Sequence, residues 1–345
     1  MENGRTSEAV IKYNKKDVTK ELKPFLESFT YVDRATGGSD ELEIVLDNSD
    51  MRFLKKQKPL KGATIQAKIV TKNWDKENTN KSFSCGTFVS DDLTSEGPES
   101  RFTLKAVSAP VKGEFRATDR TKTYKKATIR SIANKIAKRA KVNLYYDADN
   151  IKIKEIEQNR ESDSAFLTSL CEDYGLGIKV YNDKIIIYDE VKYEKKKPIK
   201  TISRLDDSVI EWSWNTTMQK TYTGVKVTYT DPSDNKKHKA KVGKKGRMLH
   251  ENVTAFSKKD AKLKAEARLR RENKKQTTMN VTVDPDPRLI ASGTVRMAGF
   301  GKASGIYFIE TATHVRGADG YVLSLEMRKI SPPGGNTLSG GSTKA

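Results

Sequence analysis

The sequence predicts a mainly β protein with an α+β insert, in which two β-barrels lie on either side of a small α+β middle domain. Short runs of alternating apolar residues fill both ends of the chain, and a helical period appears only between them and once more near residue 260. With 345 residues, the chain has room for two or three domains. We expect an N-terminal β-barrel over 1–110, a middle domain over 111–200, a C-terminal β-barrel with a basic helix over 201–330, and a flexible tail over 331–345.

The predicted N-terminal barrel is a series of short strands broken by turns. Clusters such as Gly37-Gly38-Ser39 contain residues that favour turns, and they recur at the spacing of a barrel or sandwich. The candidate strands are Ala9–Tyr13, Ser28–Val32, Glu41–Leu46, Thr64–Thr71, Phe83–Ser90 and Arg101–Val107.

Two helices and a hairpin make up the predicted middle domain. From Ala127 onward, apolar residues recur every three or four positions, which places them on one helix face. A second helix begins at Ser162 or Asp163, whose side chains can cap it, and ends at Gly175. The hairpin that follows consists of Ile178–Tyr181, the two-residue turn Asn182-Asp183 and Ile185–Tyr188.

The C-terminal barrel is predicted from strands on both sides of a helix. Between 288 and 329, glycines stand at the ends of three alternating apolar runs, where hairpin turns need positive φ. Ser257–Lys275 is predicted to be a helix, because Ser257 can cap it and Asp260 complements its dipole. Its narrow apolar seam consists of Ala261, Ala265 and Leu269. The earlier candidate strands are Val209–Trp214, Thr221–Tyr229 and Lys239–Val242.

Residues that could carry catalysis are few. The most suggestive acids, Asp284 and Asp286, each precede a proline, which favours a turn at a strand end over a hydrolytic pair. Gly299–Gly305 contains Lys and Ser but lies between two predicted strands, so we expect a hairpin loop and no nucleotide site. No nucleophile elbow, P-loop or zinc-protease motif occurs. We therefore expect no enzyme and no cofactor.

Metal sites and disulfides are not expected either. Cys85 and Cys171 are far apart, and Cys171 is predicted to be a buried free thiol. The only imidazoles, His238, His250 and His314, are remote from one another in sequence. No run approaches the roughly 18 apolar residues of a membrane span, and the N-terminus lacks a signal-peptide pattern, so we expect no membrane anchor.

A net charge of +20 raises the question of nucleic-acid binding. The basic residues are spread along the chain, and the densest runs lack the interleaved aromatics that base stacking requires. We therefore expect solvated faces or acidic protein partners, and no specific binding of nucleic acid. Strand-like segments surround the three tryptophans, which favours core or barrel-rim anchors at Trp74, Trp212 and Trp214.

The basic helix is the strongest candidate for a contact with another chain. Its apolar seam is narrow, so most of its charge lies outside the core. Arginine favours bidentate pairing with carboxylates, which a neighbouring chain would supply. The candidate contact residues are Arg268, Arg270, Arg271 and Lys274.

Three segments carry a family pattern. Ser7–Asp50 opens the chain, and Glu161–Gly175 has the pattern E-S-D-x-x-F-L-x-x-L-x-x-x-Y-G. In Arg288–Lys329, a glycine loop precedes G-x-Y-x-I-x-x-x-x-H, and Gly-Tyr precedes the last strand. These segments resemble phage tail baseplate hub proteins of the late control gene D family, and specifically its PBSX XkdQ-like branch. Matches at both ends cover most of the chain.

This resemblance implies a structural protein with two tube-type β-barrels per subunit. A homotrimer would arrange six barrels as a pseudo-sixfold ring that joins a sixfold tail tube to a threefold spike. The implied location is the baseplate of a contractile phage tail or of a phage-tail-like bacteriocin (tailocin), after synthesis in the bacterial host cytoplasm. The implied partners are the tail tube protein, the spike protein, the tape-measure protein and baseplate wedge proteins. The four candidate contact residues would then meet another subunit or the tube.

Two other functions stay open at this point. A basic nucleic-acid-binding protein would lose affinity steeply as salt is raised. A glycan hydrolase built on Asp284 and Asp286 would lose turnover on Asp286→Asn.

Overall fold

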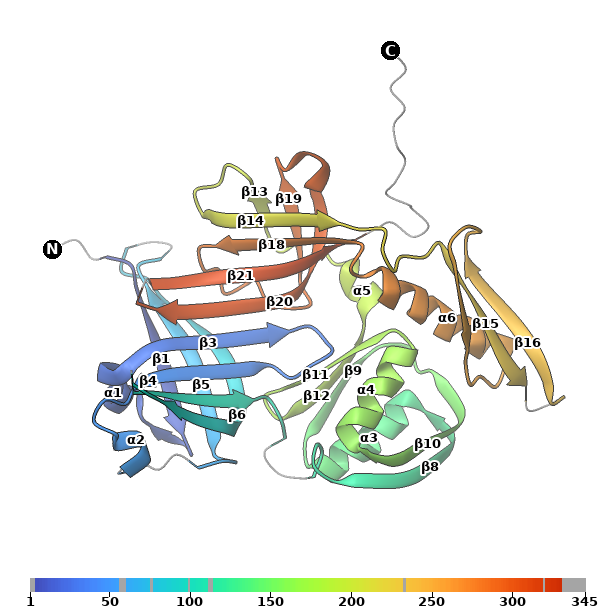
Figure 1. The fold of residues 1–345 in the computed structure, drawn as a ribbon, viewed down its shortest axis with the longest axis horizontal. Helices are drawn as coiled ribbons and strands as arrows, with labels where there is room; N and C mark the ends of the chain where they lie inside the picture. Colours follow the sequence, from blue (N-terminus) through green and yellow to red (C-terminus); the bar gives the residue numbers. More distant parts are fainter. Residues whose placement is uncertain are drawn as a thin grey trace, which may run out of the picture.

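The computed structural model describes residues 4–55, 60–74, 77–98, 100–110, 114–231, 234–318 and 320–330. Within these ranges, strands from both ends of the chain form one 13-stranded sheet, and three smaller sheets form the rest with the helices (Figure 1). The predicted mainly β class with an α+β insert is therefore confirmed. The predicted tail, 331–345, lies outside the described residues.

The N-terminal half of the large sheet encloses its own apolar core. Its strands are hydrogen-bonded in the order β3-β4-β7-β6-β5-β1-β2, with antiparallel neighbours throughout. Alternate residues point into the core, among them Phe29, Leu42 and Phe88. The elements are β1 (Thr6–Tyr13), β2 (Lys16–Asp17), α1 (Thr19–Leu22), β3 (Leu26–Arg34), β4 (Glu41–Asp47), α2 (Arg52–Lys55), β5 (Thr64–Lys72), β6 (Asn80–Glu96) and β7 (Arg101–Val107).

The C-terminal half repeats this plan with fewer strands. Their order is β14-β18-β21-β20-β19-β13, and a second apolar core that includes Val281, Tyr307 and Leu325 lies against them. The strands are β13 (Thr201–Ser203), β14 (Val209–Thr216), β18 (Thr277–Val283), β19 (Thr294–Ala298), β20 (Gly305–Gly317) and β21 (Gly320–Lys329).

One strand, β20, joins the two halves. One of its edges pairs with β21. Its other edge is divided, because Gly305–Phe308 pairs with β19 whereas Thr311–Arg316 pairs with β3. The β20–β21 register shifts between Ile309 and Thr311, which is where the partner changes. The sequence predicted two β-barrels, and the structure builds the two corresponding halves from one continuous sheet.

Tryptophans hold the ends of each half together. Trp74 Nε1 donates to the carbonyl of Thr6 on β1 over 2.8 Å, and its ring packs edge-on against Tyr321 on β21 at 5.8 Å between centroids. Trp212 on β14 packs edge-on against Phe300, which follows β19, at 5.2 Å. Trp214 packs against the C-terminal core. Trp74 and Trp214 therefore pack against the cores as predicted, whereas Trp212 is 45% exposed.

Both predicted helices of the middle domain are confirmed. The Thr128 side chain caps α3 (Ile129–Ala140), and the Ser162 side chain caps α4 (Asp163–Asp173). The predicted hairpin is β11 (Leu176–Tyr181) and β12 (Lys184–Asp189), with positive φ at both turn residues. The sequence missed the pair β8 (Asp119–Thr128) and β10 (Lys152–Ser162), the strand β9 (Asn143–Asp147), which is parallel to β12, and the short helix α5 (Glu190–Glu194).

Residues 224–273 form a separate unit, here called the basic module. Its strands pair in the order β16-β15-β17, and α6 packs on one face of this sheet around Ala261 and Ala265. Ser257 caps α6, as predicted. The sequence assigned Thr221–Tyr229 and Lys239–Val242 to the C-terminal barrel, but the structure places their strands in this separate sheet. The elements are β15 (Gly224–Asp231), β16 (Lys236–Gly243), β17 (Met248–Asn252) and α6 (Lys258–Asn273).

The two ends of the basic module lie side by side. Tyr222 N donates to Asn273 Oδ1 over 2.8 Å, and Asn273 Nδ2 donates back to the carbonyl of Tyr222 over 2.8 Å. Strand β14 precedes the module and its antiparallel partner β18 follows it. In Figure 1 the module projects at the end of the molecule opposite the N-terminal half.

Both cysteines are buried and free. Cys171 lies in the core of the middle domain, as predicted, and Cys85 lies in the core of the N-terminal half. Burial raises the pKa of both thiols, so they are protonated at neutral pH. Within the described ranges, no helix has the length and apolarity that crossing a bilayer requires.

Candidate functional site

The acids considered for catalysis lie in the turn that follows β18. Asp286 Oδ1 accepts hydrogen bonds from Arg288 N over 3.1 Å and from Arg288 Nε over 2.9 Å. The side-chain hydrogen bond from Arg288 lowers the pKa of Asp286, which keeps the carboxylate ionised. Asp284 pairs instead with Arg5, at 3.4 Å. The predicted turn is confirmed, and each acid engages a different cation.

The glycine loop and His314, which the sequence analysis also considered, lie in a hairpin loop and in an aromatic cluster. Gly299–Gly305 links β19 to β20 as a loop with one 3-10 turn, which confirms the predicted hairpin loop. The imidazole of His314 stacks on Tyr31 and Phe83, at 5.8 and 4.7 Å between centroids, and burial lowers its pKa to about 4. In the described part of the chain, no three His, Cys, Asp or Glu side chains are grouped to hold a metal ion.

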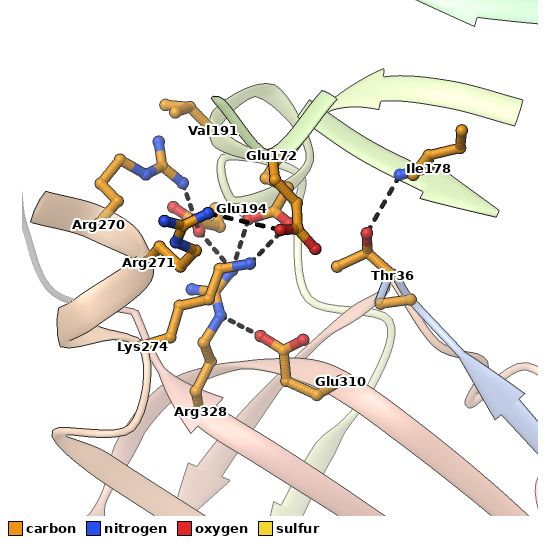
Figure 2. Close-up of polar contacts among 12 residues, drawn as sticks. Thr36, Glu172, Ile178, Val191, Glu194, Arg270, Arg271, Lys274, Glu310 and Arg328 are labelled. Carbon is orange, nitrogen blue, oxygen red and sulfur yellow. Dashed lines mark hydrogen bonds and ion pairs between the residues drawn. The ribbon is translucent and has the colours of Figure 1, made fainter. Parts of the chain in front are cut away.

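A cluster of buried and partly buried charges lies where the large sheet, α5 and α6 meet (Figure 2). We call it the arginine joint. Arg328 comes from β21 and Glu310 from β20, whereas Glu190 and Glu194 come from α5, the last helix of the middle domain. Its members are Arg270, Lys274, Arg328, Glu190, Glu194 and Glu310.

Arg328 is at the centre of the arginine joint. Its side chain is 7% exposed, and its guanidinium carbon lies 4.5 Å from the ring centroid of Phe308. Its Nη2 is 2.6 Å from Glu194 Oε1 and 3.7 Å from Glu190 Oε2, and its Nε contacts Glu310. One guanidinium cannot neutralise three carboxylates, so two further cations are needed.

Lys274 and Arg270 supply those cations. Lys274 Nζ lies 2.7 Å from Glu190 Oε1, and Arg270 Nη2 lies 2.9 Å from Glu194 Oε1. The joint therefore contains three cations and three anions. Because buried charges are costly to leave unpaired, this balance favours one arrangement of the sheet, α5 and α6.

All four predicted contact residues pair with carboxylates of their own chain. Arg268 pairs with Glu251 at 2.8 Å and Glu272 at 3.2 Å, both within the basic module. Arg271 reaches Glu172 of α4 at 3.4 Å, and Arg270 and Lys274 belong to the arginine joint. The carboxylates that the sequence analysis assigned to a neighbouring chain are thus found within the chain, and the contact with another chain stays a prediction.

Close packing also attaches α6 to the middle domain. A Cβ atom added to Gly175 would lie 3.3 Å from the Cβ of Ala267, and Gly175 has a φ of +69°. Tyr174 Oη donates to Asp260 Oδ1 over 2.8 Å beside this contact. The sequence placed Ala267 outside the helix seam, whereas the structure buries it against Gly175.

A second buried cluster, the lysine joint, consists of Lys179, Asp33 and Asp40. Lys179 on β11 lies 2.5 Å from Asp33 Oδ1 on β3 and 3.2 Å from Asp40 Oδ2. Asp33 Oδ2 accepts a hydrogen bond from Ala291 N over 2.9 Å, and Asp40 Oδ1 accepts one from Arg34 N over 3.0 Å. The lysine joint therefore connects the middle domain with both halves of the large sheet.

Neutral hydrogen bonds accompany the lysine joint. Tyr188 Oη donates to the carbonyl of Ala35 over 2.9 Å. Ile178 N donates to Thr36 Oγ1 over 3.1 Å, and Figure 2 shows this second hydrogen bond. Both donors belong to the β11–β12 hairpin, and both acceptors follow β3. The hairpin is thus held to the N-terminal half by both charged and neutral groups.

Burial determines the protonation of the lysine joint. It raises the pKa of Asp40 to about 6, with Lys179 acting in the opposite direction and Asp33 adding repulsion. Burial alone would lower the pKa of Lys179, but Asp33 and Asp40 raise it above its ordinary value, so the ammonium stays charged. Two carboxylates therefore share one ammonium in a water-poor site.

Sequence reasoning missed both joints. Lys179 lies among apolar residues of β11, whereas Arg328 lies beside Lys329 at the end of β21. Nothing in either local pattern distinguishes a buried cation from an exposed one. Their acidic partners are remote in sequence; Asp33 precedes Lys179 by 146 positions. Only the tertiary fold brings these charges together.

We predict that Arg328→Met lowers the free energy of unfolding by about 3 kcal/mol, because it leaves three carboxylates with too few cations. Urea unfolding measures the loss, and hydrogen exchange should show faster exchange in α5. Arg296→Met, at an exposed position on β19, is the matched control and should behave like the unaltered chain. Equal stabilities of the two variants would contradict a structural role for the arginine joint.

The lysine joint predicts a pH dependence. The pKa of Asp40 in the folded state, about 6, exceeds the ordinary value of about 3.9, so the folded state binds this proton more tightly. The stability that this group contributes is present below about pH 4 and is lost as the pH rises to about 6. As the pH rises between these values, the free energy of unfolding of Asp40→Asn should therefore increase by about 2–3 kcal/mol relative to that of the unaltered chain. Urea unfolding measures this difference. The exposed control Asp91→Asn should show no such trend.

Comparison with known proteins finds similarity to phage baseplate hub proteins. The chain is 27% identical over 256 residues to the probable baseplate hub protein of Escherichia phage 186, covering 72% of this chain and 62% of that protein. It is also 27% identical over 208 residues to the probable baseplate hub protein of Escherichia phage P2, covering 58% of this chain and 51% of that protein. The chain thus spans between half and two thirds of these relatives' lengths. No protein-family model matches it.

A solved structure has the same fold. The 43 kDa tail protein of prophage MuSo2 from Shewanella oneidensis superimposes with a TM-score of 0.70 at 13% identity, over 94% of this chain and 98% of that protein. At this identity the match establishes the fold alone. Sequence similarity to hub proteins and the fold of a phage tail protein agree, and together they relate this chain to the phage tail baseplate hub proteins.

Proposed function

We propose that this chain is the structural baseplate hub of a contractile phage tail or of a phage-tail-like bacteriocin. The observation that carries the proposal is the large sheet, in which two curled halves with separate cores share β20 and β21. Three such chains would present six halves around one axis. A ring of this kind matches a sixfold tail tube on one side and a threefold spike on the other.

The proposed partners follow from this ring. They are two further copies of the chain, the tail tube protein and the spike protein, with the tape-measure and wedge proteins as further neighbours. The names of the relatives from phages 186 and P2 support a place in the baseplate of the particle. Synthesis in the host cytoplasm is a further part of the proposal.

The basic helix is also proposed to contact another subunit or the tube. The four candidate contact residues form ion pairs within the chain, yet their side chains are 24–38% exposed. These residues are Arg268, Arg270, Arg271 and Lys274. Cations of this exposure can hold an internal carboxylate and still face an acidic neighbour.

We predict three copies of this chain in its complex with the spike. Native mass spectrometry of the purified complex should give three hub chains for each spike trimer, because only that ratio converts two halves per chain into a pseudo-sixfold face. The hub measured alone shows whether the spike is needed for the ring. Two or six hub chains in the complex would contradict the proposed geometry.

We also propose that the chain acts without catalysis, and predict that the purified protein leaves peptidoglycan and oligosaccharides intact between pH 4 and 8. Asp284 and Asp286, the acids considered for hydrolysis, are bound to different cations in a turn. Product release would be followed by chromatography, with Asp284→Asn and Asp286→Asn variants in parallel. Turnover that disappears in either variant would overturn this part of the proposal.

A further inference from the structure

The basic module holds a large share of the chain's positive charge. Between 224 and 273 the sequence has 15 lysines and arginines against 6 aspartates and glutamates, a net charge of +9 out of +20. Helix α6 accounts for +4 of this charge, with 7 basic and 3 acidic residues. The strands and loops of the module account for the other +5, with 8 basic and 3 acidic residues.

One face of that sheet is covered and the other presents lysines. Val225, Val227 and Ala240 are buried on the side of α6. Lys226 on β15 and the alternate residues of β16 point to the opposite side. We call the residues Lys226, Lys237, Lys239 and Lys241 the lysine face; Lys226 is partly buried and the other three are exposed.

The strand register brings these cations close together. Lys226 is the direct partner of Lys241 on one side and of His250 on the other. Like charges in opposed positions destabilise a sheet. In the described ranges, no ion pair joins a residue of the lysine face to a carboxylate, so a negatively charged partner from outside would relieve this repulsion.

The two largest segments outside the module offer no excess of acids in a second copy. Residues 1–110 contain 18 basic and 17 acidic residues, and residues 111–200 contain 21 basic and 14 acidic ones. Neither segment has an excess of acids that could match a concentrated basic face. The partner is therefore a different, anionic molecule.

The composition of the lysine face separates the classes of anionic partner. Protein interfaces have an apolar centre and are depleted in lysine, and membrane-binding faces combine lysine with Trp, Phe or Leu. The large apolar residues that are exposed in the described part of the chain all lie outside the basic module. The face also lacks arginine forks and exposed aromatics, which base recognition and stacking require. Lysine point charges alone suffice for phosphates.

We propose that the lysine face binds the phosphate backbone of double-stranded nucleic acid without reading its sequence. This binding goes beyond the hub function and does not depend on trimer formation, because the face belongs to one chain. It agrees with the expectation that nucleic acid is not specifically bound.

The test measures affinity against salt. The full chain is titrated with a fluorescent 20-base-pair DNA duplex at several NaCl concentrations by anisotropy. In the variant K226Q/K237Q/K239Q/K241Q, the slope of log K against log salt should fall by about 3–4, because each phosphate contact contributes about 0.9. At low salt its affinity should fall by at least about tenfold. A second duplex of unrelated sequence should bind equally well.

A matched control removes the same charge elsewhere. K12Q/K20Q/K61Q/K68Q takes four exposed lysines from the N-terminal half and should leave the slope within about one unit of the unaltered chain. Thermal unfolding by circular dichroism should show no loss of stability in K226Q/K237Q/K239Q/K241Q, since a like-charge pair is removed. Equal slopes in the two variants would overturn the proposal. So would stronger binding to polyglutamate or to phosphatidylserine vesicles than to the duplex, which would assign the face to an acidic polypeptide or a lipid surface.

Discussion

The backbone N–H and C=O groups of β20 are hydrogen-bonded along its length only because this strand belongs to both halves of the large sheet. It has 13 residues, whereas its neighbour β19 has 5, so a second partner is needed for the rest of that edge. Strand β3 supplies this partner, and the stack of Tyr31 on His314 lies within the same stretch of paired residues. Strand β21 follows β20 and contributes Tyr321 to one core and Leu325 to the other. The relation between the halves is therefore fixed by backbone hydrogen bonds.

The same strands hold the other units in place. Asp33 of the lysine joint is on β3, Glu310 of the arginine joint is on β20, and Arg328 is on β21. A buried ion pair adds little net stability compared with apolar packing, but breaking it is costly. Charged joints therefore select one orientation of the middle domain and of α6 relative to the sheet.

The parts of this fold that depend on neighbouring residues could be predicted from the sequence. The period of Ile129, Ile132 and Ile136, the Ser162 and Ser257 caps and the Asn182-Asp183 turn each act within a few positions. Strand β8 was missed because its residues, apart from Tyr124, show little alternating burial. The shared strand β20 and both joints depend on partners far away in sequence. The lysine face did have a local signal, the period-two lysines at 237, 239 and 241, but a strand pattern does not reveal which sheet it joins.

The hydrogen bonds between Tyr222 and Asn273 have a consequence for how such chains diversify. They bring the entry and exit of the basic module together beside an existing pair of strands, and the module has its own core. A unit of this kind can be exchanged as a whole while β14 and β18 stay paired, provided that the new unit supplies the contacts that α6 makes with Gly175, Glu172 and Glu194. The two halves of the large sheet lack that freedom, because β20 and β21 serve both cores and must be inherited with each of them.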